Sequence, residues 1–169
     1  AHALLDAGLE KGDAVAICMV NSVEMLECLF GAVRAGGCAV PLSGLLTGEQ
    51  LAGLISDSEA RFAFLSDDFA ERLLPRRDGL PGIRAWVGHG AGAAAEGVTP
   101  LPAFLEGRPA TTPPVRHASA DRFNIIYSSG TTGLPKGIVQ THRARLHWAF
   151  SNAVEMGFQA DCRALTTTA

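Results

Sequence analysis

Within ten positions, the run 128–137 collects the residue types that a phosphate-binding loop needs. It holds three glycines, four hydroxyl side chains and one lysine. Glycines expose backbone N–H groups without a Cβ in the way, and successive inward-facing N–H groups form a concave anion site. Hydroxyls donate hydrogen bonds to phosphate oxygens, and a lysine adds positive charge. These residue types predict a binding site for the phosphates of a nucleotide, formed by Ser128, Ser129, Gly130, Thr131, Thr132, Gly133 and Lys136.

Three other interpretations of this run fit less well. A polar hairpin turn would suit Pro135 and Gly137, but the full ten-residue run exceeds what a turn requires. A Walker-type loop needs a glycine directly before its lysine, whereas Lys136 follows Pro135. A dinucleotide-binding loop needs two glycines separated by one residue, whereas Gly130 and Gly133 are three apart and no glycine lies two positions before them.

Residues 127–137 resemble the signature loop Tyr-Thr/Ser-Ser-Gly-Thr/Ser-Thr-Gly-x-Pro-Lys-Gly of one superfamily. Its members are the acyl-CoA synthetases, the firefly luciferases and the adenylation domains of nonribosomal peptide synthetases. Residues 39–61 and 140–143 are similar to the stretches that flank this loop in the family. The resemblance covers most of the chain and is weakest over 88–120.

The resemblance implies an ATP-dependent ligase that activates a carboxylic acid as acyl-AMP and passes the acyl group to a thiol, usually that of coenzyme A. ATP, Mg²⁺ and coenzyme A are the implied cofactors, and the loop is expected to hold the β- and γ-phosphates. The residues that bind the metal stay open. The resemblance also puts His142 near the site, although we favour a structural role for it.

The carboxylic acid is left open by the sequence. A fatty or aromatic acid is the first hypothesis, and Thr131 favours it weakly because adenylation domains more often have serine there. One alternative is an amino-acid adenylation domain of a peptide synthetase. Another is a nucleotide-binding fragment without chemistry. The oligomeric state is also open.

Several parts of the family's machinery are expected downstream of these 169 residues. They are the adenine- and ribose-binding segments, the magnesium-binding glutamate and the C-terminal lid domain. We therefore expect the chain to be the first part of the large N-terminal domain, without a catalytic residue and inactive alone. We divide it into an α/β unit at 1–87, a Gly/Ala/Pro-rich connection at 88–120 and a phosphate-loop unit at 121–169.

Apolar strands alternate with amphipathic helices along the sequence, and this order predicts an α/β fold with a mostly parallel sheet. The expected strands are 14–20, 38–42, 61–65, 83–87, 123–127 and 137–140. Helices are expected after the N-caps Asn21 (with Glu24 at N3), Thr47 (in a capping box with Gln50), Ser66 and Thr141.

Three of these helices carry apolar residues at helical spacing, and the helix after Thr47 has Leu51, Leu54 and Ile55 on one face. The helix after Asn21 has Val23, Leu26, Phe30 and Val33 in this pattern. The helix after Thr141 carries Trp148 and Phe150, which we expect to pack in the core.

Composition excludes several other classes of protein. The net charge is −3 and the basic residues form no long cluster, so no nucleic-acid partner is expected. No apolar run approaches the roughly 20 residues that span a bilayer. Cys18, Cys28 and Cys38 lie in apolar stretches, and we interpret them as core residues of a protein in a reducing, cytoplasmic setting.

Overall fold

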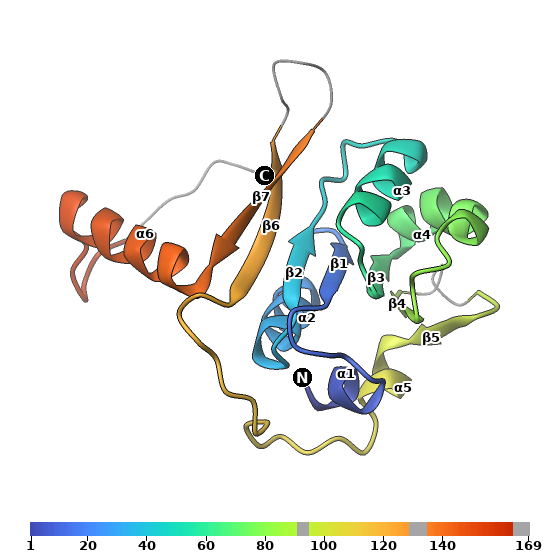
Figure 1. Ribbon diagram of the computed structural model, residues 1–169, viewed down its shortest axis with the longest axis horizontal. Helices are drawn as coiled ribbons and strands as arrows, with labels where there is room; N and C mark the ends of the chain where they lie inside the picture. The colour runs from blue at the N-terminus through green and yellow to red at the C-terminus, as the bar shows by residue number, and fades with distance from the viewer. Residues whose placement is uncertain (91–94, 129–134, 164–169) are drawn as a thin grey trace.

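The computed structural model describes residues 1–90, 95–128 and 135–163 (Figure 1). The helices of these residues are α1 (His2–Asp6), α2 (Val23–Arg34), α3 (Gly48–Asp57), α4 (Asp67–Leu73), the 3₁₀ helix η1 (Leu74–Gly79), α5 (Leu101–Leu105) and α6 (His142–Glu155). Their strands are β1 (Ala14–Cys18), β2 (Cys38–Pro41), β3 (Phe62–Ser66), β4 (Ala85–His89), β5 (Val98–Pro100), β6 (Arg122–Ser128) and β7 (Lys136–Thr141).

All these strands join in one sheet with the order β5-β4-β3-β1-β2-β6-β7. Neighbouring strands from β5 to β6 run parallel, and only the last pair in this order, β6 with β7, is antiparallel. Helix α2 connects β1 to β2, α3 connects β2 to β3, and α4 connects β3 to β4. Such helical crossovers are the usual connections between parallel strands. The predicted α/β fold with a mostly parallel sheet is therefore confirmed.

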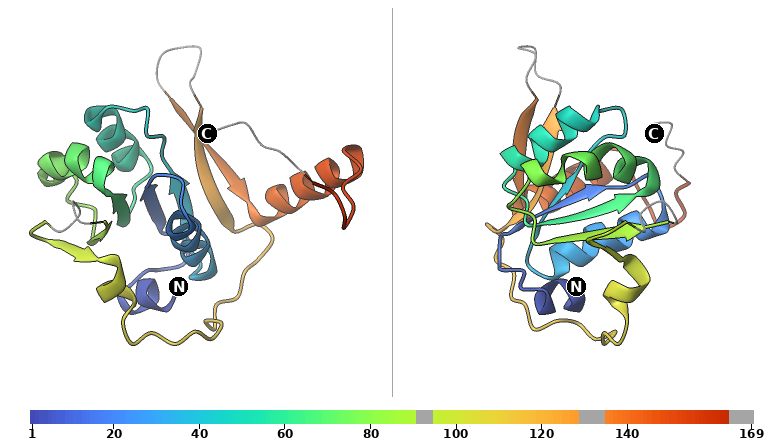
Figure 2. Two further views of the ribbon diagram at one scale, coloured as in Figure 1. Left: turned by 180° about the vertical axis from the view of Figure 1, so that it is seen from behind. Right: turned by 90° about the vertical axis from the view of Figure 1, so that its right-hand side faces the viewer.

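Helices cover both faces of the central strands (Figure 2). On one face, Ala16 and Cys18 of β1 belong to the apolar cluster that includes α3 and α4. On the other face, Val15 and Ile17 belong to the cluster that includes α1, α2 and α5. Because both faces are covered, every residue of β1 is buried, which explains its continuous apolar run.

The capping box predicted for α3 is present. The Thr47 hydroxyl accepts from the Gln50 backbone N–H at 3.3 Å, and the Gln50 side chain accepts from the Thr47 backbone N–H at 2.9 Å. Ser66 is the N-cap residue of α4, as predicted, but its hydroxyl makes no capping bond. That hydroxyl accepts from the Val20 backbone N–H and donates to the Asp68 carboxylate, so it links the ends of β1 and β3.

Two predictions for α2 are wrong. The N-cap is Ser22, whose hydroxyl accepts from the Met25 backbone N–H at 3.1 Å, and not Asn21. The side chain of Glu24 is therefore one position too early for the predicted box.

The buried face of α2 also differs from the predicted one. Cys28, Ala32 and Val33 are buried, whereas three of the four predicted residues, Val23, Leu26 and Phe30, are about half exposed or more. Apolar residues occur on more than one side of this helix, so spacing alone does not select a face. The small side chains Cys28 and Ala32 decide the outcome, since they let the helix lie close to the sheet.

The segment 88–120 is only partly the connection that we expected. The fourth strand extends to His89, and a further short strand and helix, β5 and α5, follow within this segment. Val98 and Leu101 are buried in the two apolar clusters. We expected a short helical turn within 99–105, and α5 lies there, whereas the strand β5 was not expected. An element of three residues is too short to show a periodic pattern.

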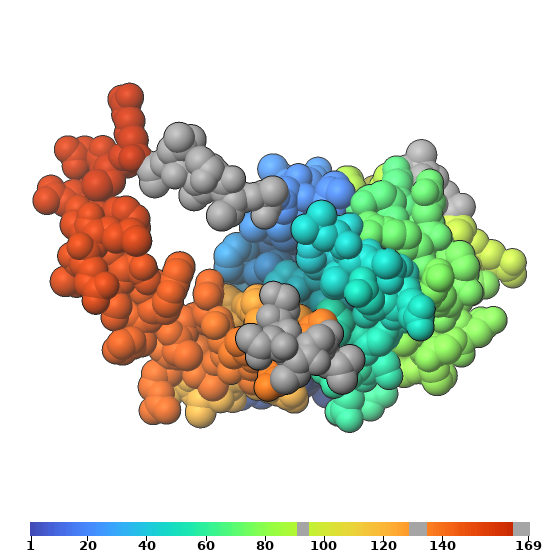
Figure 3. Space-filling view, turned by 90° about the horizontal axis from the view of Figure 1, so that it is seen from above, coloured from blue at the N-terminus to red at the C-terminus, as the bar shows by residue number. Residues whose placement is uncertain are grey.

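Helix α6 stands away from the rest of the molecule, on the far side of β7 (Figure 3). The predicted cap is present, because the Thr141 hydroxyl accepts from the Ala144 backbone N–H at 3.2 Å. The expectation that Trp148 and Phe150 pack in the core is wrong for this chain, since their exposed fractions are 58% and 65%. None of the residues of α6 is buried among the described residues.

Candidate functional site

The predicted phosphate loop connects the two antiparallel strands at one edge of the sheet. Strand β6 ends at Ser128 and β7 begins at Lys136, and these two residues are paired directly opposite each other. The structure thus brings together the first and the last of the predicted site residues. The others, Ser129, Gly130, Thr131, Thr132 and Gly133, lie outside the described residues.

The register between β6 and β7 fixes which residues lie at the base of the loop. The register runs from Arg122 opposite Thr141 to Ser128 opposite Lys136, with one shift between Arg122 and Asn124. Both Ser128 and Lys136 are exposed. A hydroxyl and an ammonium group therefore face solvent at the base of the predicted phosphate loop, and both are groups that hydrogen-bond to anions.

Tyr127 connects the loop end of β6 to helix α3. Its hydroxyl donates to the Asp57 carboxylate at 2.5 Å and lies 3.3 Å from the Leu54 carbonyl oxygen. Burial, followed by the hydrogen bond to Asp57, raises the pKa of Tyr127 above its usual value of 10.0. The phenol is therefore protonated at neutral pH and acts as the donor. Sequence reasoning included Tyr127 in the signature but gave no role to Asp57.

The Tyr127 ring also lies against the other strand of the hairpin. Gly137 is paired with Tyr127, and a Cβ at position 137 would come within 3.1 Å of ring atom Cε1. The ring therefore occupies the space that a side chain at 137 would need. A glycine at this position lets one aromatic ring contact both strands that carry the loop.

His142 is not close to Lys136 in the structure. It begins α6, beyond the opposite end of β7, and about 3.3 Å per strand residue puts it roughly 20 Å from Lys136. Its ring lies 5.2 Å from the ring of Phe123, edge to face, and 5.1 Å from that of His117. Burial and then the neighbouring His117 lower the pKa of His142, so its imidazole is neutral at pH 7. These contacts fit the structural role that we favoured.

The described residues include no group of three or more His, Cys, Asp or Glu side chains that could hold a metal ion. The Asp57 carboxylate accepts from Tyr127.

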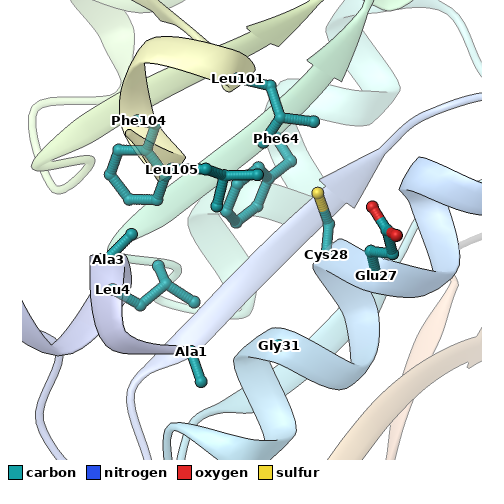
Figure 4. Close-up of a pocket in the computed structure, with 10 residues that line it drawn as sticks. All are labelled: Ala1, Ala3, Leu4, Glu27, Cys28, Gly31, Phe64, Leu101, Phe104 and Leu105. Carbon is teal, nitrogen blue, oxygen red and sulfur yellow. The ribbon is translucent and has the colours of Figure 1, made fainter. Parts of the chain in front are cut away.

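A small apolar cavity lies between α1, α2 and α5, away from the loop (Figure 4). Phe64, Phe104, Leu4 and the thiol of Cys28 line it. Its volume is about 40 Å³. Sites for small-molecule ligands typically measure about 300–1,000 Å³, so this cavity is too small for a ligand of that size.

The cysteines have the environments that the sequence indicates. Cys18, Cys28 and Cys38 are buried with free thiols, whereas Cys162 is exposed. Burial raises the pKa of Cys18 and Cys28 to about 12 and that of Cys38 to about 11. These three thiols are therefore protonated and unreactive at neutral pH. Within the part of the chain that is described, no helix has the length and apolar character of a bilayer span.

Comparison with known proteins identifies relatives over nearly the whole chain. A family model for the AMP-binding enzymes matches residues 1–168. The long-chain-fatty-acid–CoA ligase FadD13 of Mycobacterium tuberculosis is 33% identical over 155 residues, which are 90% of this chain and 29% of the ligase. The 3-hydroxybenzoate–CoA/4-hydroxybenzoate–CoA ligase of Thauera aromatica is 32% identical over 145 residues, which are 86% of this chain and 28% of the ligase.

Solved structures agree with this result. The inhibitor-bound N-terminal domain of FACL13 from Mycobacterium tuberculosis superposes with a TM-score of 0.77 at 32% identity. The match covers 95% of this chain and 38% of that domain structure. The chain spans less than a third of the length of each of the two ligases, so it corresponds to one part of such a protein.

Proposed function

Because the chain belongs to the family of AMP-binding enzymes, we propose that its parent protein is an ATP-dependent carboxylate–CoA ligase. A carboxylate oxygen attacks the α-phosphate of ATP, and acyl-AMP forms as pyrophosphate leaves. The thiol of coenzyme A then attacks the acyl carbon, and AMP leaves. The observation that carries this proposal is the glycine- and hydroxyl-rich loop between β6 and β7, with Ser128 and Lys136 paired at its base.

The loop's part in this reaction is to bind the β- and γ-phosphates. Negative charge grows on these phosphates as pyrophosphate leaves, and fixed donors that face them stabilise the transition state. We assign this role to the loop N–H groups, to the hydroxyls of the loop and to the Lys136 ammonium group. The exposed position of Lys136 at the first residue of β7 supports the assignment, since its long side chain can turn toward the loop.

Magnesium would neutralise part of the charge on the ATP phosphates. The described residues include no group of three or more His, Cys, Asp or Glu side chains that could hold it.

A fatty or aromatic acid is our proposal for the substrate, with coenzyme A as the acceptor. Two relatives support the acid and the acceptor, because one is a ligase for long-chain fatty acids and the other a ligase for hydroxybenzoates, each with CoA. The three buried free thiols support a reducing, cytoplasmic setting for the enzyme.

Acid-dependent exchange of labelled pyrophosphate into ATP tests the proposal on the full-length protein. A panel of fatty, aromatic and amino acids is added one at a time, with magnesium present. We expect exchange with at least one fatty or aromatic acid, followed by thioester formation when CoA is added. Exchange with amino acids alone would favour a peptide-synthetase adenylation domain. No exchange with any acid would contradict the proposed activity.

The chain 1–169 provides a control in the same assay. Acid and nucleotide must be held in line for attack on the α-phosphate, and one loop cannot align both. We therefore expect no acid-dependent hydroxamate when the chain alone is incubated with ATP, acid and hydroxylamine.

A further inference from the structure

Strand β6 shares one ladder position with the body of the sheet, and its buried residues Asn124 and Ile125 lie at and beside that position. Its pairing with β2 is recorded at one position, Ala39 with Asn124, near the end of β6 that is remote from the loop. By contrast, β6 pairs with β7 along its whole length. Beyond Asn124 no ladder position with β2 is recorded, and Ile125 is the last buried residue of β6. Nearer the loop, the half-buried Tyr127 is the side chain of β6 that can attach the hairpin to the body of the molecule.

Tyr127 provides an attachment at the right place. It directly precedes Ser128, the first of the proposed phosphate-binding residues. Its hydroxyl donates to the Asp57 carboxylate at 2.5 Å, and its ring packs against the apolar cluster that contains α3. The same ring lies over Gly137, next to Lys136. One side chain thus contacts α3, β6 and β7 together.

Helix α3 is a firm anchor for this contact. Its N-terminus is fixed by the capping box of Thr47 and Gln50. Leu51 and Ile55 are fully buried in the core. Asp57 is the last residue of the helix, so its carboxylate is held at a defined position relative to the sheet.

We propose that Asp57 and Tyr127 form a tether between α3 and the β6–β7 hairpin that positions the phosphate loop for ATP. Both are positioning residues, since they act through Ser128 and Lys136. The inference rests on the proposed function of the loop. It predicts that loss of the tether weakens the use of ATP and leaves binding of the carboxylic acid unchanged.

The tether affects ATP through the fraction of molecules in which the hairpin is correctly positioned. A ligand that binds only one arrangement has its apparent affinity reduced by the fraction of molecules in that arrangement. A hydrogen bond to a charged group is strong enough to change such a fraction about tenfold. Loss of the tether would let the loop end of the hairpin fluctuate more, so both the placement of the loop and the amide protection at that end of β7 would be affected.

Four single variants of the full-length enzyme and the double variant Tyr127→Phe/Asp57→Ala test the tether. Tyr127→Phe removes the donor and keeps the ring, and Asp57→Ala removes the acceptor. Asp57→Asn keeps a carbonyl oxygen that can accept from the tyrosine, so it should restore function. Thr47→Ala is the matched control, because it weakens the same helix at its other end and leaves the tether intact.

The readouts are the KM values for ATP and for the acid in pyrophosphate exchange, together with amide hydrogen exchange of β7. For Tyr127→Phe and Asp57→Ala we expect the KM for ATP to rise about tenfold, the KM for the acid to stay within about twofold, and β7 to exchange faster. The double variant should be no worse than either single one, since both break the same bond. Asp57→Asn should remain within about threefold of the wild type for ATP.

The control separates positioning from general loss of stability. Thr47→Ala should lower the melting temperature while the KM for ATP and the exchange of β7 stay unchanged. If the wild type is active and the variants Tyr127→Phe and Asp57→Ala have the same KM for ATP as the wild type, the tether is overturned while the proposed function stands. An equal rise in the KM for ATP in Thr47→Ala would also overturn it. A wild type without acid-dependent exchange would instead overturn the proposed function, and the assigned role of the tether with it.

Discussion

Replacement of Gly137 by alanine probes the contact between the two strands that carry the loop. A Cβ built at this position lies 3.1 Å from Ile125 Cγ2, 3.1 Å from Tyr127 Cε1 and 3.2 Å from Tyr127 Cζ. Carbon atoms in favourable contact are about 3.5–4.0 Å apart. The new methyl group therefore overlaps its neighbours by several tenths of an ångström, and the Tyr127 ring has to move away from β7.

The size of the effect follows from two opposing terms. Overpacking of this kind costs about 1–3 kcal/mol. Replacing glycine with alanine restricts the unfolded chain and returns about 0.4–1 kcal/mol. We therefore expect Gly137→Ala to lower the free energy of unfolding of the chain by about 1–2 kcal/mol. The displaced ring also pulls the Tyr127 hydroxyl away from Asp57.

Urea unfolding of the 169-residue chain, followed by circular dichroism, measures this cost. The same substitution is made in a Tyr127→Ala background, where the ring is absent. The cost should fall to less than half there, with the remainder due to Ile125. An unchanged unfolding free energy for Gly137→Ala, or the same cost in both backgrounds, would refute the packing that we describe.

Three further predictions concern charge, ionisation and thiols. In the full-length enzyme, Lys136→Ala should remove about 1–3 kcal/mol of transition-state stabilisation, seen as a lower kcat/KM for ATP with the KM for the acid unchanged. Steady-state kinetics with an unchanged kcat/KM for ATP and a raised KM for the acid would contradict the role of Lys136. The raised pKa of Tyr127 means that the folded chain holds the phenolic proton more tightly than the unfolded chain. This stabilisation is complete below pH 10 and is lost as pH rises above it, so urea unfolding should show falling stability there, and titration of the single tyrosine by ultraviolet absorbance should show a midpoint above that of the urea-unfolded chain. At neutral pH, Cys162 should react rapidly with iodoacetamide and the three buried thiols only after unfolding, which mass spectrometry of the alkylated chain can check.

Local patterns in the sequence predicted the elements that position the loop. The β-branched run before Ser128 and the run after Lys136 gave both strands of the hairpin to within a residue or two. Polar residues that cap helices also predicted where helices begin, as the capping box of α3 and the N-cap of α6 show. These signals depend on neighbours within a few positions, so a single sequence contains them.

Features that depend on distant contacts were missed. The Tyr127–Asp57 bond joins residues 70 positions apart, and nothing near Asp57 in the sequence marks it as a partner. The buried face of α2 depends on which side meets the sheet, and apolar residues lie on more than one side of that helix. The exposure of Trp148 follows from the position of α6 beside β7, which spacing along one helix cannot reveal.

A crystal structure of the full-length enzyme with a non-hydrolysable ATP analogue tests the central claim most directly. The account predicts that the β- and γ-phosphates lie within hydrogen-bonding distance of the loop between β6 and β7, with Lys136 Nζ beside them and Tyr127 still bonded to Asp57. A nucleotide whose phosphates lie elsewhere, with the loop free of contacts to it, would contradict the account.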